Sequence, residues 1–165
     1  MAEGSPHRLL RDGNQLIDSY NRGAKIQPLP QVNAEDVLMS ITHIFAPPGI
    51  KAPPLSFATR TGDLLFISGI PGFDGSGVLP ESFEAQFANV VTNFTRVLTE
   101  AGATTRHLVK VNVLLTRSSD VATMNRLYAD AFGPAPYPAR TTCVVHALPS
   151  PQMLIEIEGV ASMAG

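Results

Sequence analysis

The chain is poor in cysteine and in charge, and both shortages exclude classes of protein. Cys143 is the only cysteine among 165 residues, so neither an intrachain disulfide nor a cysteine-built zinc site can form. The 12 basic residues stand singly and are outnumbered by 14 acidic ones, whereas a nucleic-acid binder normally gathers basic residues to neutralise phosphates. Nucleic acid is therefore disfavoured as a partner.

Long apolar runs are absent too. No stretch approaches the roughly 20 apolar residues that a membrane-spanning helix needs. The first residues, MAEGSPHRLLRDGNQ, lack the unbroken apolar segment of a signal peptide. We therefore expect no membrane contact and a reducing, cytoplasmic location.

The residues that are present suit one globular domain with an extension. Apolar residues make up 44% of the chain and charged residues 16%, enough for a core and too little charge for a disordered protein. Residues 1–37 mix charge, glycine and proline without a sustained period, and we interpret them as an N-terminal arm. Residues 38–165 are expected to form the folded domain.

Apolar periodicity predicts two helices. Over residues 82–101 the apolar side chains recur every three or four positions, and Gly102 follows where a left-handed C-terminal cap favours glycine. A second helix is expected over residues 120–132, with Ser118 or Ser119 as its N-terminal cap.

Alternating or continuous apolar runs between turn residues predict strands. These strands cover residues 37–45, 55–59, 64–69, 109–115, 140–146 and 153–161. Their order with the helices predicts an α+β fold, a mixed or antiparallel sheet with two helices packed on one face. The other face of such a sheet needs cover, which an oligomer would supply.

Arg140 is the first polar residue that needs an explanation. It opens a predicted strand whose β-branched residues indicate burial, so its guanidinium needs an anionic partner or a cleft. The planar fork of arginine binds a carboxylate through two parallel hydrogen bonds, which lysine cannot do. A structural ion pair and a binding site are both open at this point.

Glu156 and Glu158 form the second feature. Strand alternation places both on the face opposite Ile155 and Ile157. A carboxylate there can orient or deprotonate a water, but a solvated sheet face explains the pair more simply.

The remaining candidates carry weaker signals. His146 is expected to be a strand-end histidine and Cys143 a core residue, while Ser68 and Asn125 have no signal of their own. No histidine spacing matches a metal site, and no glycine-rich phosphate loop is present.

Eight segments of the domain form a familiar series when they are taken together. They are FISGIP at 66–71, AQ at 85–86, VVTNF at 90–94, AGA at 101–103, VKVNV at 109–113, MNRLY at 124–128, PARTT at 138–142 and IEIE at 155–158. In order and spacing this series resembles the Rid (reactive intermediate deaminase) family over residues 40–163, and PARTT and IEIE are its most specific parts.

The resemblance implies a fold and an activity. The fold is that of trimeric chorismate mutase, in which three subunits join their sheets into a barrel with the helices outside and a cleft at each interface. Family members hydrolyse small 2-imino or 2-enamino acids to 2-oxo acids and ammonia in that cleft. No cofactor and no metal is implied.

The resemblance also assigns roles. The family's essential arginine falls on Arg140 and its water-positioning glutamate on Glu156. Its Ser-Gly serine falls on Ser68 and its pocket asparagine on Asn125, and Thr142 is expected to join them in binding substrate.

Departures from the family pattern bear on the substrate. Pro53-Pro54-Leu55 stands where imine deaminases usually have Gly-Pro-Tyr, so a pocket hydroxyl is lost, and the Ser-Gly-Ile-Pro segment is one residue shorter. PARTT, the residues around His146 and IEIE resemble the branch that deaminates 2-aminomuconate, where His146 would meet a second carboxylate or relay a proton.

Other functions remain open at this point. They are general deamination of 2-aminoacrylate, ligand binding without turnover, RNA cleavage and a chaperone-like role. The presence of both Arg140 and Glu156 favours an enzyme over a binding protein, and the acidic charge balance disfavours RNA.

Overall fold

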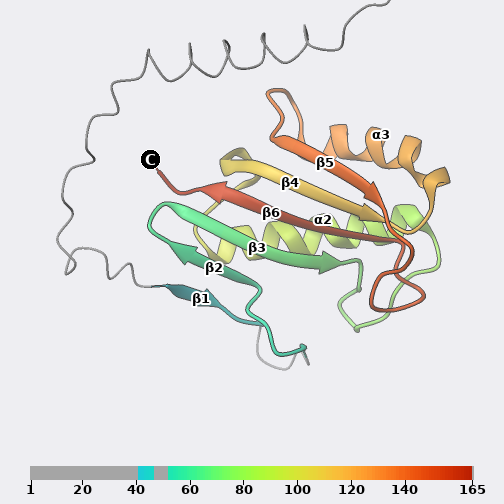
Figure 1. The fold of residues 1–165 in the computed structure, drawn as a ribbon, viewed down its shortest axis with the longest axis horizontal. Coiled ribbons are helices and arrows are strands. Elements are labelled where there is room, and N and C mark those ends of the chain that lie inside the picture. Colours follow the sequence, from blue (N-terminus) through green and yellow to red (C-terminus); the bar gives the residue numbers. More distant parts are fainter. Residues whose placement is uncertain (1–40, 47–51, 165) are drawn as a thin grey trace, which may run out of the picture. The chain divides into compact units, whose positions relative to one another are not determined.

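The computed structural model describes residues 41–46 and 52–164, which form one sheet and two α-helices (Figure 1). The elements are β1 (Thr42–Ile44), β2 (Ala58–Thr61), β3 (Leu64–Pro71), α2 (Phe83–Glu100), η2 (Thr105–His107), β4 (Leu108–Leu115), η3 (Ser118–Asp120), α3 (Val121–Phe132), β5 (Ala139–Val144) and β6 (Ile155–Ser162). The arm predicted for residues 1–37 lies outside the described residues.

The sheet has six strands in the order β1-β2-β3-β6-β4-β5. Every neighbouring pair is antiparallel except β4 and β5, which run parallel and are connected through α3. Residues of α2 and α3 join one buried cluster with alternate residues of the sheet, so both helices cover the same face (Figure 1). The α+β prediction of a mixed sheet with two helices on one face is confirmed.

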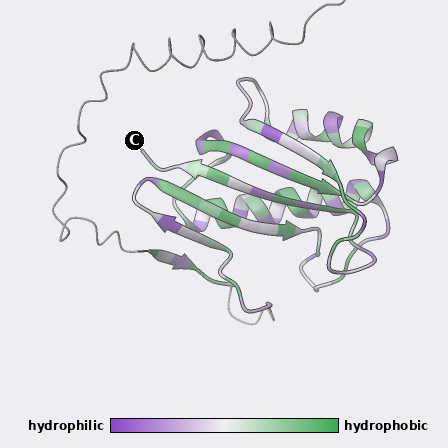
Figure 2. Ribbon diagram, viewed as in Figure 1, coloured by the Kyte–Doolittle hydropathy of each residue, from purple (hydrophilic) through white to green (hydrophobic). Residues whose placement is uncertain are grey.

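Hydrophobic and hydrophilic residues alternate along the central strands (Figure 2). Val111, Val113, Ile155 and Ile157 are fully buried under the helices, while the residues between them in each strand are partly exposed, so the two faces of the sheet differ. We call the uncovered side the open face. It carries Leu64, Phe66, Lys110, Asn112, Leu114, Cys143, Glu156, Glu158 and Val160.

The first predicted helix has the expected ends. The Ser82 hydroxyl accepts a hydrogen bond from the Ala85 N–H at 3.2 Å, and Gly102 follows the helix with a φ of 76°. No helix in the described ranges is both long enough and apolar enough to cross a membrane.

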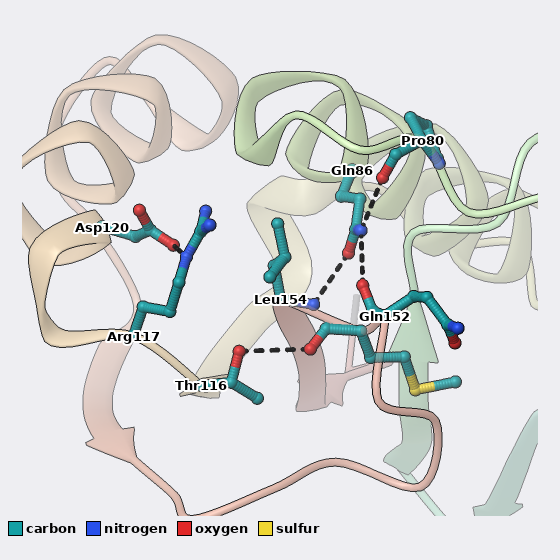
Figure 3. Close-up of polar contacts among 8 residues, drawn as sticks. Pro80, Gln86, Thr116, Arg117, Asp120, Gln152 and Leu154 are labelled. Carbon is teal, nitrogen blue, oxygen red and sulfur yellow. Dashed lines mark hydrogen bonds and ion pairs between the residues drawn. The ribbon is translucent and has the colours of Figure 1, made fainter.

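The capping prediction for the second helix is wrong. Residues Ser118–Asp120 form a 3-10 turn, so Asp120 rather than a serine precedes α3. Its carboxylate does not cap the helix, because it accepts a hydrogen bond from Arg117 Nε at 2.7 Å instead (Figure 3).

β2 begins later than predicted, at Ala58 rather than at residue 55. The Leu55 N–H turns back to the Pro53 carbonyl at 2.8 Å, and pairing with the neighbouring strand starts at Phe57, whose N–H reaches the Ile44 carbonyl at 2.7 Å. The proline turn therefore extends further than the apolar pattern indicates.

The prediction that the strand at Arg140 is largely buried is wrong, and so is the placing of Cys143 in the core. β5 is an edge strand with β4 as its one neighbour, and five of its six residues are exposed. Its β-branched residues indicate a strand but do not show where in the sheet it lies.

The amide of Gln86 joins two loops at one end of the sheet (Figure 3). This buried side chain donates to the carbonyls of Pro80 and Gln152 at 2.7 and 2.8 Å, and accepts from the Leu154 N–H at 2.9 Å. Leu154 lies two residues before Glu156, so Gln86 fixes the start of the strand that carries this carboxylate.

Candidate active site

Arg140 lies against helix α3. Its Nη2 donates to Asn125 Oδ1 at 2.6 Å, and its Nη1 is 3.7 Å from Met124 Sδ. The guanidinium carbon is 4.5 Å from the centre of the Tyr128 ring, a cation–π distance. These contacts orient the guanidinium and leave other N–H donors for a ligand.

A pocket of about 330 Å³ opens at this guanidinium. It is lined by Asn125, Tyr128, Ala129, Tyr137, Pro138 and Arg140. The ion pairs within the described part of the chain are Arg60–Asp63 and Arg117–Asp120, so Arg140 has no carboxylate partner there. The site can therefore accept a carboxylate from a small molecule.

Two hydroxyls near Arg140 are buried without a hydrogen-bond partner among the described residues. They belong to Tyr128 and Thr142. Burial raises the pKa of Tyr128, an effect that Arg140 partly offsets and Tyr137 adds to. Tyr128 consequently stays a neutral phenol at physiological pH.

Glu156 is half-buried on the open face. Its carboxylate crosses Gly69, because a Cβ built on Gly69 would lie 2.2 Å from Glu156 Oε1. Burial is the main cause that raises the pKa of Glu156, and the neighbouring Glu158 carboxylate raises it further. A carboxylate with a raised pKa is a stronger base.

The two glutamates differ in their partners. Glu158 Oε1 accepts a hydrogen bond from Asn112 Nδ2 at 2.7 Å, whereas Glu156 has no side-chain partner within the described ranges. Glu156 is thus the one whose oxygens remain available for a water.

Ser68 lies next to Gly69 but its proton is already used. The hydroxyl donates to the Ser56 carbonyl at 2.7 Å, and the backbone N–H of Ser68 reaches the Phe57 carbonyl at 3.0 Å. The hydroxyl oxygen can still accept a hydrogen bond.

Arg140 and Glu156 lie on opposite faces of the sheet. Leu114 pairs with both Glu156 and Cys143, which places these two side chains on the open face. Arg140 is three residues from Cys143 along β5 and pairs with the buried Val111, so it lies on the helix face. One chain therefore does not bring Arg140 and Glu156 together.

The predicted site residues fall into two groups and one outlier. Asn125 and Thr142 lie with Arg140 on the helix side, and Ser68 lies beside Gly69, over which the Glu156 carboxylate rests. His146 is exposed beyond the end of β5 and joins neither group. Among the described residues, no three His, Cys, Asp or Glu side chains are placed to hold a metal ion.

The family model described as Endoribonuclease L-PSP matches residues 49–163. The chain belongs to this family, the Rid family. It is 38% identical over 119 residues to "Reactive Intermediate Deaminase A, chloroplastic" of Arabidopsis thaliana, covering 68% of this chain but only 63% of that protein. It is 36% identical over 111 residues to "Protein mmf2, mitochondrial" of Schizosaccharomyces pombe, covering 66% and 87% of the two chains.

Solved Rid structures have the same fold. RidA from the Antarctic bacterium Psychrobacter sp. superposes with a TM-score of 0.64 at 36% identity, covering 68% of this chain and 91% of that one. The Rid family protein YyfA of Yersinia pestis gives a TM-score of 0.69 at 30% identity, covering 74% and 99%.

Sequence reasoning missed three residues of this candidate site. Tyr128 and Tyr137 line the pocket, and Gly69 makes room for the Glu156 carboxylate. A glycine inside a strand signals a close approach, so Gly69 could have been singled out. The two tyrosines gave no such signal, because one fits a core helix stripe and the other lies in a proline-rich connector.

Proposed function

We propose that the protein is a cofactor-independent hydrolytic deaminase that converts a small imine or enamine carboxylic acid into an oxo acid and ammonia. The observation that carries the proposal is the oriented guanidinium of Arg140, which opens into a pocket and lacks a carboxylate partner among the described residues. The name of the Arabidopsis relative, a reactive intermediate deaminase, supports the same chemistry.

In the proposed reaction Arg140 binds the substrate carboxylate, and Asn125 keeps the guanidinium in place through its 2.6 Å hydrogen bond. The Thr142 hydroxyl, buried and without a described partner, supplies a further polar contact. Holding the carboxylate places the adjacent C=N carbon for attack.

An enamine substrate first becomes the imine, as a carbon of its C=C–N system takes up a proton and the nitrogen loses one. Glu156 then aligns the attacking water and accepts its proton. The water oxygen bonds to the imine carbon, the nitrogen takes up a proton, and a tetrahedral carbinolamine forms. Its C–N bond then breaks as the C=O bond forms, and the nitrogen leaves with a further proton as ammonia. The raised pKa of Glu156 suits a group that accepts and returns protons during this sequence.

We propose that the complete site lies between copies of the chain in a homotrimer, with Arg140 from one copy and Glu156 from the next. The separation of these two residues on opposite faces supports this arrangement. The open face supports it as well, because Leu64 and Phe66 are each 44% exposed there.

For the substrate we propose 2-aminomuconate or a related ring-cleavage product, in which His146 meets the second carboxylate. The exposure of His146 at the end of β5 leaves it free to do so. The alternatives are a general 2-aminoacrylate deaminase and a ligand-binding homologue without turnover. A cytoplasmic location stays a prediction, since two relatives carry chloroplastic and mitochondrial names.

The decisive experiment is ammonia release by the purified protein from enzymatically generated 2-aminomuconate and, separately, 2-aminoacrylate. We expect turnover of the muconate, lost in Arg140→Ala. Turnover of 2-aminoacrylate alone would support the deaminase activity and refute 2-aminomuconate as the substrate. Acceleration of neither, with ligand binding that still depends on Arg140, would identify the non-catalytic binder.

A further inference from the structure

The pocket at Arg140 has aromatic walls that the proposed reaction does not use. The rings of Tyr128 and Tyr137 lie with their centres 6.4 Å apart and tilted by 44°. The ring of Tyr128 already has partners on both faces. It stacks on Phe132, with the ring centres 4.3 Å apart, and the guanidinium of Arg140 lies over it. Tyr137 is 48% exposed, so part of its ring remains available to a ligand.

The connector between α3 and β5 holds Tyr137 in place. Arg106 Nη1 donates to the Pro134 carbonyl at 2.9 Å, which ties the connector to the turn before β4. Gly133 packs so closely on the last turn of α3 that a Cβ there would lie 2.4 Å from the Ala129 carbonyl oxygen and 3.4 Å from the Tyr137 hydroxyl. Tyr137 is therefore a preformed wall of the pocket.

The walls limit what a bound carboxylate can carry. Once its carboxylate is on Arg140, a substituent that extends into the pocket meets Tyr137, Pro138 and Ala129. An aromatic ring favours a flat π-system packed against it over a puckered aliphatic chain of equal size.

We propose that Tyr137 is a specificity-determining residue that selects carboxylic acids whose substituent is planar and unsaturated. This inference rests on the proposed function only where it treats such an acid as a substrate that the protein turns over. The preference itself is a property of the pocket and is open to a binding measurement.

The first test is binding of benzoate and cyclohexanecarboxylate, which share a charge and a size but differ in planarity. We expect the intact protein to bind benzoate about three- to tenfold more tightly, the range that aromatic pairing gives. Tyr137→Leu should remove most of this difference and Tyr137→Phe should keep it. Calorimetric titration gives the affinities, and thermal melting shows whether each variant is folded.

The second test is turnover of the 2-imino acids that an L-amino-acid oxidase makes from phenylalanine and from leucine. Tyr137→Leu should lower the ratio of kcat/KM for the phenylalanine-derived imine to kcat/KM for the leucine-derived imine by about three- to tenfold, as in the binding test. Tyr137→Phe should leave the ratio unchanged.

The outcomes separate this inference from the proposed function. The role of Tyr137 would be overturned, and the deaminase retained, if both imines were turned over but benzoate and cyclohexanecarboxylate bound equally well. The same conclusion would follow if Tyr137→Leu left the kcat/KM ratio of the two imines unchanged. A benzoate preference that disappears in Tyr137→Leu, without turnover of any imine, would retain the role of Tyr137 and refute the deaminase.

Discussion

At the scale of single residues, the contact between Gly69 and Glu156 controls where the carboxylate lies. A Cβ at position 69 would be 2.2 Å from Glu156 Oε1 and 2.7 Å from its Cδ, while the atoms it meets belong to the end of a flexible side chain. A methyl group there should displace the carboxylate without breaking the sheet.

Gly69→Ala should therefore lower kcat for ammonia release by about tenfold or more, the loss expected when a catalytic group is misplaced. KM should change less, because Arg140 remains intact. Gly75→Ala is the matched control, since nothing lies within 4 Å of a Cβ there. Equal rates for both variants would mean that the position of Glu156 does not limit the reaction.

The charge of Glu158 should be visible in the pH dependence of turnover. Burial and, after it, Glu158 raise the pKa of Glu156, so activity that needs ionised Glu156 falls at a higher pH than for an ordinary glutamate. Glu158→Gln removes the second cause and should move the acid limb of kcat/KM to lower pH. An unmoved limb in a folded variant would show that another group sets it.

The same raised pKa has a consequence for stability. Because folded Glu156 binds its proton more tightly than the unfolded chain does, its ionisation destabilises the fold as pH rises through the raised pKa. Glu156→Gln should abolish ammonia release and yet melt no lower than the parent protein at neutral pH. A clearly lower melting temperature there would mean that the carboxylate makes stabilising contacts.

The residue roles were predictable only through the family resemblance. Alternation alone placed Glu156 and Glu158 on one face. It could not show that Glu158 has a hydrogen-bond partner and Glu156 has none among the described side chains, because the partner, Asn112, comes from another strand. Likewise the neighbours of Arg140 come from α3, twelve to sixteen positions away in the chain, and no local pattern indicates them.

At the scale of elements, Gln86 determines how two loops meet. Its amide satisfies Pro80, Gln152 and Leu154 at once, and a Cβ on Gly72 would come within 2.6 Å of the Gln86 carbonyl oxygen. These contacts join the start of α2 to the segment before β6.

Gln86→Met keeps the volume of the side chain and removes its hydrogen bonds. We expect the free energy of unfolding to fall by about 2 kcal/mol or more, because buried polar groups lose their partners. Asn93→Ala, which removes one hydrogen bond to the Phe73 carbonyl, should cost about 1 kcal/mol in the same urea titration. Equal losses would indicate that water replaces the Gln86 amide.

The elements themselves were mostly readable from the chain. Both helices and all six strands of the described residues have counterparts in the apolar pattern, because burial on one face produces a period. The pattern failed at the start of β2, where a proline turn continues, and at η3, where a tight turn replaces a serine cap. It also could not place β5 at the edge, since strand order depends on pairing between distant segments.

At the scale of the whole molecule, the open face and the divided site lead to one prediction about assembly. If each site takes Arg140 and Glu156 from different copies, Arg140→Ala and Glu156→Gln chains are each inactive but complement one another. Coexpression in equal amounts should give about a quarter of the parental rate, because each half of a site is intact in half of the copies.

The control for complementation is each variant expressed alone, which should release ammonia no faster than the uncatalysed reaction. A coexpressed mixture that stays inactive, although both chains fold and associate, would mean that each chain carries its own complete site. Sedimentation measurements on the same samples give the number of copies.

The pocket at Arg140 is drawn from one continuous stretch of chain. Its lining runs from Asn125 on α3 to Arg140 on β5, while Gly69 and Glu156 belong to strands outside that stretch. Recognition and water activation can accordingly vary independently among relatives. Exchanging residues 124–146 between two of them would exchange the carboxylate pocket together with His146, so the choice of substrate should follow this segment while the residues that activate water stay unchanged.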